Sequence, residues 1–139
     1  MKNGDISNQL PLVIAFKLEG TVVDFKGKAL SSFLRNKLQL KGTCEYKDTV
    51  IELMEWFFYR TEYTIDLVVN RETYNKCSWV YEDLPFSRII IMDKFSQITS
   101  RLLMGDITYY VDNSAINRSQ VNNKYALSVE ELRDVLKFI

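Results

Sequence analysis

The sequence predicts an α/β fold in which a parallel β-sheet lies between two layers of helices. Short runs rich in β-branched and aromatic residues alternate with segments whose apolar residues recur at helical spacing, a pattern typical of βα units. The chain has 139 residues, the size of one domain, and 47% of them are hydrophobic, which is enough for a packed core. We therefore expect a single three-layer, Rossmann-like domain over residues 1–139.

Four segments are predicted to be strands of this sheet. Each is a short apolar run with strong β-propensity that ends at polar residues. In chain order they are residues 12–16, 64–69, 88–92 and 107–111.

Helices are predicted in the intervening and closing segments. Thr49 and Glu52 form a capping box, and apolar residues at helical spacing follow, so a helix is expected over 49–59. Ser128 and Glu131 repeat this signal before a closing amphipathic helix. Helical spacing also marks 72–81 and 95–104, and it makes 29–40 a further candidate in a stretch that is otherwise hard to assign.

The composition excludes several classes of function. Eighteen basic and eighteen acidic residues cancel, so the chain lacks the positive field that attracts nucleic acid or anionic membranes. There is no histidine, and Cys44 and Cys77 lie far apart in the sequence, which excludes histidine-based catalytic triads, histidine-ligated zinc and a CxxC redox motif. No apolar run is long enough to span a bilayer, and the N-terminus is polar, so we expect a cytoplasmic protein without a membrane partner.

Polar residues follow each predicted strand directly. In open parallel sheets, ligands bind outside the carboxyl ends of the strands, near the point where the strand order reverses. The residues at these ends are Lys17 and Glu19 after the first strand, Asn70 and Arg71 after the second, Asp93 and Lys94 after the third, and Asp112 and Asn113 after the fourth.

Four motifs in this order resemble those of the haloacid dehalogenase-like (HAD) superfamily of phosphatases. They are "FKLEGTVVDF" (16–25), "IDLVVNRE" (65–72), "MDKF" (92–95) and "YYVDNSAIN" (109–117), and the last also resembles the small nucleotidase branch. The family's first strand ends in Asp-x-Asp-Gly-Thr, its second in Ser or Thr, its third region supplies a Lys, and its fourth strand ends in an acidic pair. The resemblance covers residues 12 to about 117 and implies a HAD-like fold without a large cap domain.

The chain departs from this pattern at the residues that carry the chemistry. By the resemblance, Lys17 replaces the aspartate nucleophile, whereas Glu19 retains a carboxyl group at the acid/base position and Thr21 matches the motif's threonine. The Ser/Thr position falls on Val69 or Asn70, depending on the register. Lys94 matches the family's lysine, and Asp112 matches a metal ligand whose acidic partner is replaced by Asn113.

The cation at Lys17 changes the expected electrostatics of the site. The family binds Mg²⁺ between the first aspartate and the fourth-motif acid, and this ion prefers negatively charged oxygen ligands. Two like unit charges about 4 Å apart repel by about 4 kcal/mol at an effective dielectric constant near 20, and a dication doubles this energy. We therefore expect no magnesium or other cofactor. Instead, the ammonium group of Lys17 should pair with Asp112, Glu19 or both, with Lys94 adding a second positive charge to the same cleft.

Three functional interpretations follow from the sequence. The first is a catalytically inactive HAD-fold protein that binds a protein partner, through the aromatic run 56–59 or the basic segment 26–47, or an anionic ligand, through Lys17 and Lys94. The second is an active phosphatase or nucleotidase with a non-standard mechanism that uses Glu19 and Asp112 to activate water. The third is an unrelated α/β binding domain in which Lys17 is an ordinary loop residue, and a strand order that separates the first strand from the fourth would establish it.

Overall fold

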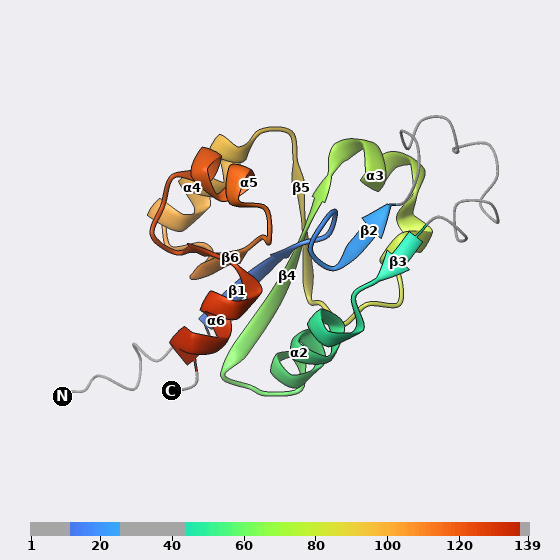
Figure 1. Cartoon of the computed structure of the whole chain (residues 1–139), viewed down its shortest axis with the longest axis horizontal. Helices are drawn as coiled ribbons and strands as arrows, with labels where there is room; N and C mark the ends of the chain where they lie inside the picture. Colours follow the sequence, from blue (N-terminus) through green and yellow to red (C-terminus); the bar gives the residue numbers. More distant parts are fainter. Residues whose placement is uncertain (1–11, 26–43, 137–139) are drawn as a thin grey trace.

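The computed structural model describes residues 12–25 and 44–136, which form a five-stranded sheet flanked by helices (Figure 1). The strand order is β5-β4-β1-β6-β7, and each neighbouring pair is parallel. The strands are β1 (Leu12–Lys17), β4 (Tyr63–Asn70), β5 (Arg88–Met92), β6 (Tyr109–Val111) and β7 (Ala126–Leu127). The predicted α/β class and parallel sheet are confirmed.

The central strand β1 is the point where the strand order reverses. From β1 the chain adds β4 and then β5 on one side, and it then crosses to add β6 and β7 on the other. Residue Ile14 is paired with Ile65 of β4 and with Tyr109 of β6. The carboxyl ends of β1 and β6 therefore meet where open α/β sheets usually bind ligands.

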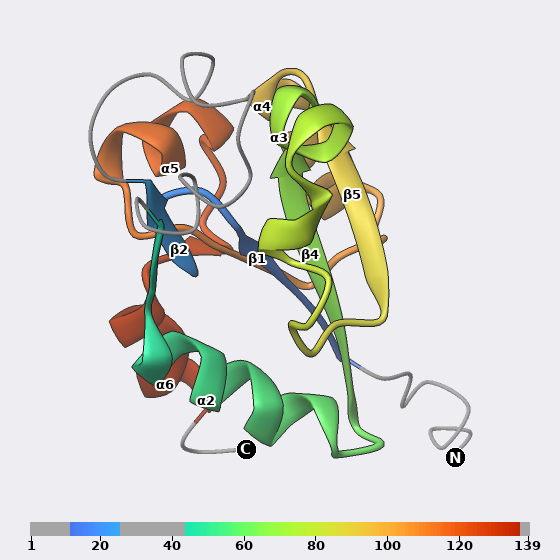
Figure 2. The same ribbon diagram turned by 90° about the vertical axis from the view of Figure 1, so that its right-hand side faces the viewer.

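Helices cover both faces of the sheet because side chains alternate along each strand. On one face, Ile14 and Phe16 pack with residues from α2 (Asp48–Phe58) and α6 (Val129–Leu136). On the other face, Ala15 packs with residues from α4 (Phe95–Leu103) and α5 (Ala115–Val121). Figures 1 and 2 show these two helix layers on opposite sides of the sheet.

A small hairpin-like sheet extends the end of β1. Strands β2 (Val23–Phe25) and β3 (Cys44–Tyr46) pair antiparallel, with Val23 opposite Tyr46. The hydroxyl group of Tyr46 donates to the carbonyl group of Val80 over 2.8 Å, which ties this sheet to the main body. The sequence did not predict these strands, and the helix expected over 29–40 lies outside the described residues.

Several predicted elements differ from the structure. The helix expected over 72–81 is two pieces, α3 (Arg71–Lys76) and the 3₁₀-helix η3 (Ser78–Val80), because most residues of this segment are weak helix formers. The strand expected over 107–111 begins only at Tyr109, since the Thr108 side chain, at 3.0 Å, accepts the Val13 N–H in place of a backbone partner. The helix α5 and the short strand β7 were not predicted.

The remaining helices agree closely with the predictions from apolar spacing, but the capping box predicted at Thr49 and Glu52 is not formed, because α2 begins at Asp48 and its N-cap is Lys47. Helix α2 buries Val50, Met54 and Phe57, and α6 begins after a cap in which Ser128 Oγ accepts the Glu131 N–H at 3.1 Å. The Glu131 carboxylate accepts the Ser128 N–H at 2.8 Å, which completes the predicted capping box. Within residues 12–25 and 44–136, every helix is too short or too polar to cross a lipid bilayer.

Candidate functional site

A polar cleft lies at the carboxyl ends of β1, β4 and β5. Its volume is about 470 Å³, in the range typical of small-molecule sites. Two apolar side chains, Met92 and Phe95, form part of its wall. Its polar lining consists of Lys17, Asn70, Arg71, Asp93 and Asn117. Of these residues, Lys17 and Asn70 were predicted as site residues, whereas Arg71 and Asp93 were noted only as residues that follow strands.

Lys17 is a buried cation at the end of the central strand. It is only 2% exposed, and its Nζ lies 2.9 Å from Glu19 Oε1. The second carboxylate oxygen of Glu19 accepts the backbone N–H of Asn70 at 3.0 Å. Glu19 thus joins the end of β1 to the end of β4 and neutralises the lysine, as one of the predicted pairings required.

The loop after β1 is folded tightly enough to hold Glu19 in this position. The carbonyl group of Leu18 accepts the N–H groups of Val22 and Val23 at 3.1 and 3.0 Å. Gly20 has φ +86°, a left-handed conformation that glycine adopts without steric cost. The sequence Glu-Gly-Thr therefore forms a compact turn in which the glutamate faces β4 and the threonine faces β6.

Asp112 is the centre of a second, separate cluster at the end of β6. It is 1% exposed, and its carboxylate accepts four hydrogen bonds. The donors are Tyr110 Oη at 2.6 Å, the Ser114 N–H at 2.9 Å, Asn117 Nδ2 at 3.0 Å and Thr21 Oγ1 at 3.4 Å. Burial, and next the Asp112 carboxylate, hold the pKa of Tyr110 well above its ordinary range, so this phenol remains a hydrogen-bond donor.

Thr21 connects the β1 loop to the end of β6. Its side chain is fully buried, and besides donating to Asp112 it accepts the Asn113 N–H at 3.0 Å. The Asp112 carbonyl group accepts a hydrogen bond from Arg118 Nη1 at 2.8 Å. Thr21 therefore lies beneath the cleft as part of its support, and it does not form part of the lining.

The lining of this cleft does not include five of the predicted site residues, which are Glu19, Thr21, Lys94, Asp112 and Asn113. Lys94 is exposed and is not among the lining residues, but its charge, after the effect of Arg71, helps to lower the pKa of Asp93 in the cleft lining. The backbone N–H of Lys94 donates at 3.0 Å to Gln97 Oε1 at the start of α4. The side-chain oxygen of Asn113 accepts the Val129 N–H at 3.1 Å, which directs it toward the first turn of α6.

The second cation of the cleft is Arg71, which forms an ion pair with Asp93. Arg71 Nε lies 2.7 Å from Asp93 Oδ1, and Arg71 Nη2 lies 2.9 Å from Oδ2, a bidentate arrangement. The arginine lowers the pKa of Asp93 below its ordinary value. The sequence indicated only that Arg71 and Asp93 each directly follow a strand. That the two side chains pair depends on the register of β4 against β5, in which Asn70 pairs with Met92.

The described residues do not fit the magnesium site that the family resemblance implies. Both oxygens of Asp112 accept hydrogen bonds from protein donors, and Lys17 occupies the first ligand position with a positive charge. Within the described part of the chain, no group of three or more Cys, Asp or Glu side chains is arranged to hold a metal ion. We therefore derive no chemistry from a metal here.

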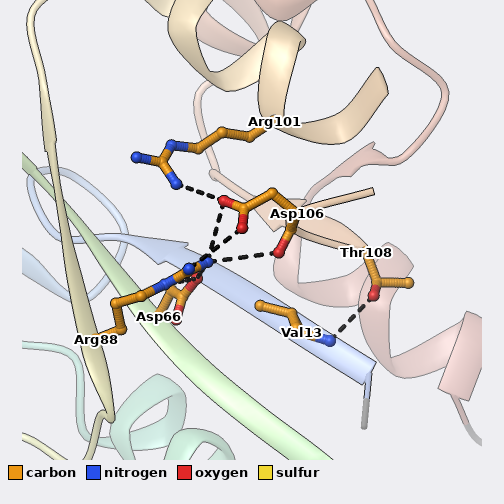
Figure 3. A network of polar contacts seen from close by, with 6 residues as sticks. All are labelled: Val13, Asp66, Arg88, Arg101, Asp106 and Thr108. Atoms are coloured by element: carbon orange, nitrogen blue, oxygen red, sulfur yellow. Dashed lines mark hydrogen bonds and ion pairs between the residues drawn. The ribbon is translucent and has the colours of Figure 1, made fainter. Parts of the chain in front are cut away.

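A network of charged residues ties the sheet together near the start of β5 (Figure 3). Asp66, within β4, is fully buried, and its Oδ2 accepts Arg88 Nε at 3.1 Å and Arg88 Nη2 at 2.6 Å. Arg88 also binds Asp106, which pairs with Arg101. Asp66 Oδ1 has no hydrogen-bond partner among the described residues, and burial raises the pKa of this carboxyl group.

An apolar groove lies between α2 and α6 on the outside of the molecule. Its volume is about 340 Å³, and Leu53, Trp56, Tyr63 and Leu136 contribute to its wall. The Trp56 side chain is 48% exposed, and the guanidinium group of Arg60 stacks over its ring at 3.4 Å. Part of the aromatic run 56–59 therefore lies on the surface of the molecule.

Comparisons with known proteins give no match for this chain. No family model matches it, and no curated protein or solved structure shows significant similarity. What the cleft binds is therefore inferred from its own residues.

Proposed function

We propose that this chain is a catalytically inactive HAD-fold protein that binds a small anionic ligand in the Lys17 cleft without a metal ion. The observation that carries this proposal is the buried ammonium group of Lys17, which lines the cleft at the end of the central strand. In the family that the sequence resembles, this position holds the carboxylate that attacks phosphorus. An ammonium group cannot form that covalent intermediate, but it can bind an anion.

The hydrogen-bonding capacity of the cleft supports an anionic ligand. An ammonium group has three N–H donors, and among the described residues only Glu19 accepts from Lys17. A guanidinium group has five N–H donors, and Arg71 uses two of these donors to bind the Asp93 carboxylate. The cleft therefore presents unused donors on two cations, and an oxyanion supplies the acceptors that these groups lack.

The two remaining carboxylates support binding over catalysis. A carboxylate has about four lone-pair sites, and a general base needs one of them free to accept a proton from water. The four hydrogen bonds of Asp112 fill its sites, and Glu19 directs one oxygen to Lys17 and the other to the Asn70 N–H. Each acid is thus used to organise the loops around the cleft.

The strand order supports the HAD-like alignment of the motifs. A strand order that separated the first and fourth motif strands would have ruled out this alignment, and β1 instead pairs directly with β6, as the first and fourth strands do in Rossmann-like sheets generally. This adjacency brings Thr21 of the first motif against Asp112 of the fourth, although the two residues are 91 positions apart. Motifs that are distant in the sequence therefore meet at one edge of the sheet.

The proposal is tested by measuring the binding of inorganic phosphate by calorimetry, in EDTA and in excess Mg²⁺. We expect wild-type protein to bind phosphate equally in both solutions and Lys17→Met to lose binding. Lys76→Met is the matched control, because Lys76 is an exposed lysine that pairs only with Glu72 among the described residues. Circular dichroism shows whether Lys17→Met is folded, and Lys17→Gln is the second variant if it is not.

Two results would contradict the proposal. One is phosphate binding that requires Mg²⁺ or that survives unchanged in Lys17→Met and Lys17→Gln. The other is turnover of p-nitrophenyl phosphate that disappears in Glu19→Gln, which would establish the alternative, an active phosphatase that uses Glu19 and Asp112.

A further inference from the structure

The two ion pairs of the cleft differ in how firmly their carboxylates are held. The carboxylate of Glu19 is 14% exposed and is fixed on both oxygens, by Lys17 and by the Asn70 N–H. The Asp93 side chain is 42% exposed, and among the described residues its carboxylate oxygens are bound only by Arg71. Displacing Asp93 therefore breaks one exposed pair, whereas displacing Glu19 disrupts a buried cluster.

The geometry of the Arg71–Asp93 pair matches what an oxyanion ligand offers. Asp93 presents two oxygens to Nε and Nη2 in parallel, the arrangement in which guanidinium groups recognise carboxylates and phosphates. The pair connects the residue after β4 to the residue after β5, and both residues line the cleft. The side chain of Asp93 thus occupies the position on Arg71 that a ligand oxyanion would take.

We propose that Asp93 is a built-in competitor for the ligand, and that an oxyanion binds in the cleft by replacing the Asp93 carboxylate on Arg71. This inference rests on the proposed anion-binding function. It adds the chemical class of the ligand and the means by which Asp93 selects among anions. The ligand group is one that offers two oxygens to the guanidinium fork, such as a carboxylate or a phosphate, and halides do not satisfy this requirement.

The displaced carboxylate also makes the cleft selective for ligand charge. Asp93 remains tethered beside Arg71 after displacement, so its negative charge repels the incoming anion. Glu19 already pairs with Lys17, so part of the positive charge of the cleft is compensated before a ligand binds. The cleft therefore disfavours dianions relative to monoanions, and the charge of Asp93 contributes to this preference.

The test compares the affinities of phosphate and acetate for wild-type protein, Asp93→Asn and Arg71→Lys at constant ionic strength. The asparagine is nearly the same size as aspartate and lacks its charge. We expect Asp93→Asn to bind both anions more tightly, by about three- to tenfold for phosphate and by less for acetate. Arg71→Lys keeps the charge but loses the fork, so phosphate binding should weaken. Asp134→Asn on α6 is the control for a general loss of negative charge, because Asp134 is exposed and lies outside this cleft.

The outcomes separate this inference from the proposed function. If phosphate binding depends on Lys17 but is unchanged or weaker in Asp93→Asn, Asp93 is not a competitor and the anion-binding function stands. If neither wild-type protein nor Asp93→Asn binds phosphate or acetate, both proposals fail. If chloride binds Asp93→Asn as tightly as acetate does, the requirement for a two-oxygen ligand is wrong.

Discussion

The ammonium group of Lys17 lies 2.9 Å from the carboxylate of Glu19, two residues further along the same loop. Sequence reasoning left open whether Lys17 pairs with Glu19, Asp112 or both, and the structure shows the pair with Glu19. The Asp112 carboxylate instead has neutral hydrogen-bond donors from the loop after β1, from the end of β6 and from α5. The two acidic positions of the resemblance therefore belong to separate clusters joined through the loop at Thr21.

Replacing Lys17 by methionine should destabilise the fold as well as remove anion binding. The change leaves the mostly buried Glu19 carboxylate without its counter-ion, which should lower the free energy of unfolding by about 3 kcal/mol. Urea unfolding followed by circular dichroism measures this change. The double variant Lys17→Met/Glu19→Gln removes both charges and should recover much of the lost stability. A double variant that is less stable than Lys17→Met would contradict a role of Lys17 in compensating Glu19.

Replacing Thr21 by valine should destabilise the junction between the β1 loop and β6. Valine has the same shape but cannot accept the Asn113 N–H or donate to Asp112. Leaving such buried groups unpaired costs about 1–3 kcal/mol. Thr21→Ser keeps the hydroxyl group and should therefore lose clearly less stability than Thr21→Val. Equal stability of the valine and serine variants in denaturant unfolding would show that the hydroxyl group does not support this junction.

Replacing Asp66 by asparagine should change how stability depends on pH. Burial raises the pKa of Asp66 in the folded state above its ordinary value of about 4. The folded state therefore retains this proton more strongly than the unfolded state does. The resulting stabilisation is fully present below the unfolded pKa and is lost as the pH rises through the folded pKa. Relative to Asp66→Asn, wild-type protein should lose stability as the pH rises from the unfolded-state pKa of Asp66 through its folded-state pKa.

The measurement for Asp66 is the free energy of unfolding of both proteins from acidic to neutral pH. Asp134→Asn is the control, because Asp134 is exposed on α6. A difference between wild-type protein and Asp66→Asn that does not vary with pH would contradict the raised pKa. A difference that increases in favour of wild-type protein as the pH rises would show that Arg88 outweighs the burial of Asp66.

The sequence predicts the elements of the sheet better than the contacts between them. Apolar runs and spacing identified β1, β4, β5 and α2, and a capping box identified the start of α6, because these signals are local. The contact between Thr21 and Asp112 depends on the pairing of β1 with β6, which no local pattern encodes. Asp66 lies within the apolar run "IDLVV", and its burial becomes understandable only once Arg88 is placed beside it by the register of β5.

Part of the candidate site was predictable because the carboxyl ends of parallel strands meet at one edge. This rule placed Lys17 and Asn70 at the same cleft. It could not show that Asn113 turns toward α6 or that Lys94 lies outside the cleft, since both depend on how the following helices begin. The contribution of Asn117 was missed because α5 has no regular apolar stripe in the sequence.

The most direct test of the central claim is the affinity of inorganic phosphate with and without magnesium, measured by calorimetry on wild-type protein and on Lys17→Met. If the tethered ammonium group of Lys17 supplies the positive charge of the cleft, phosphate binds equally well in EDTA and in excess Mg²⁺, and Lys17→Met does not bind it. Phosphate binding that appears only when Mg²⁺ is added would contradict the account.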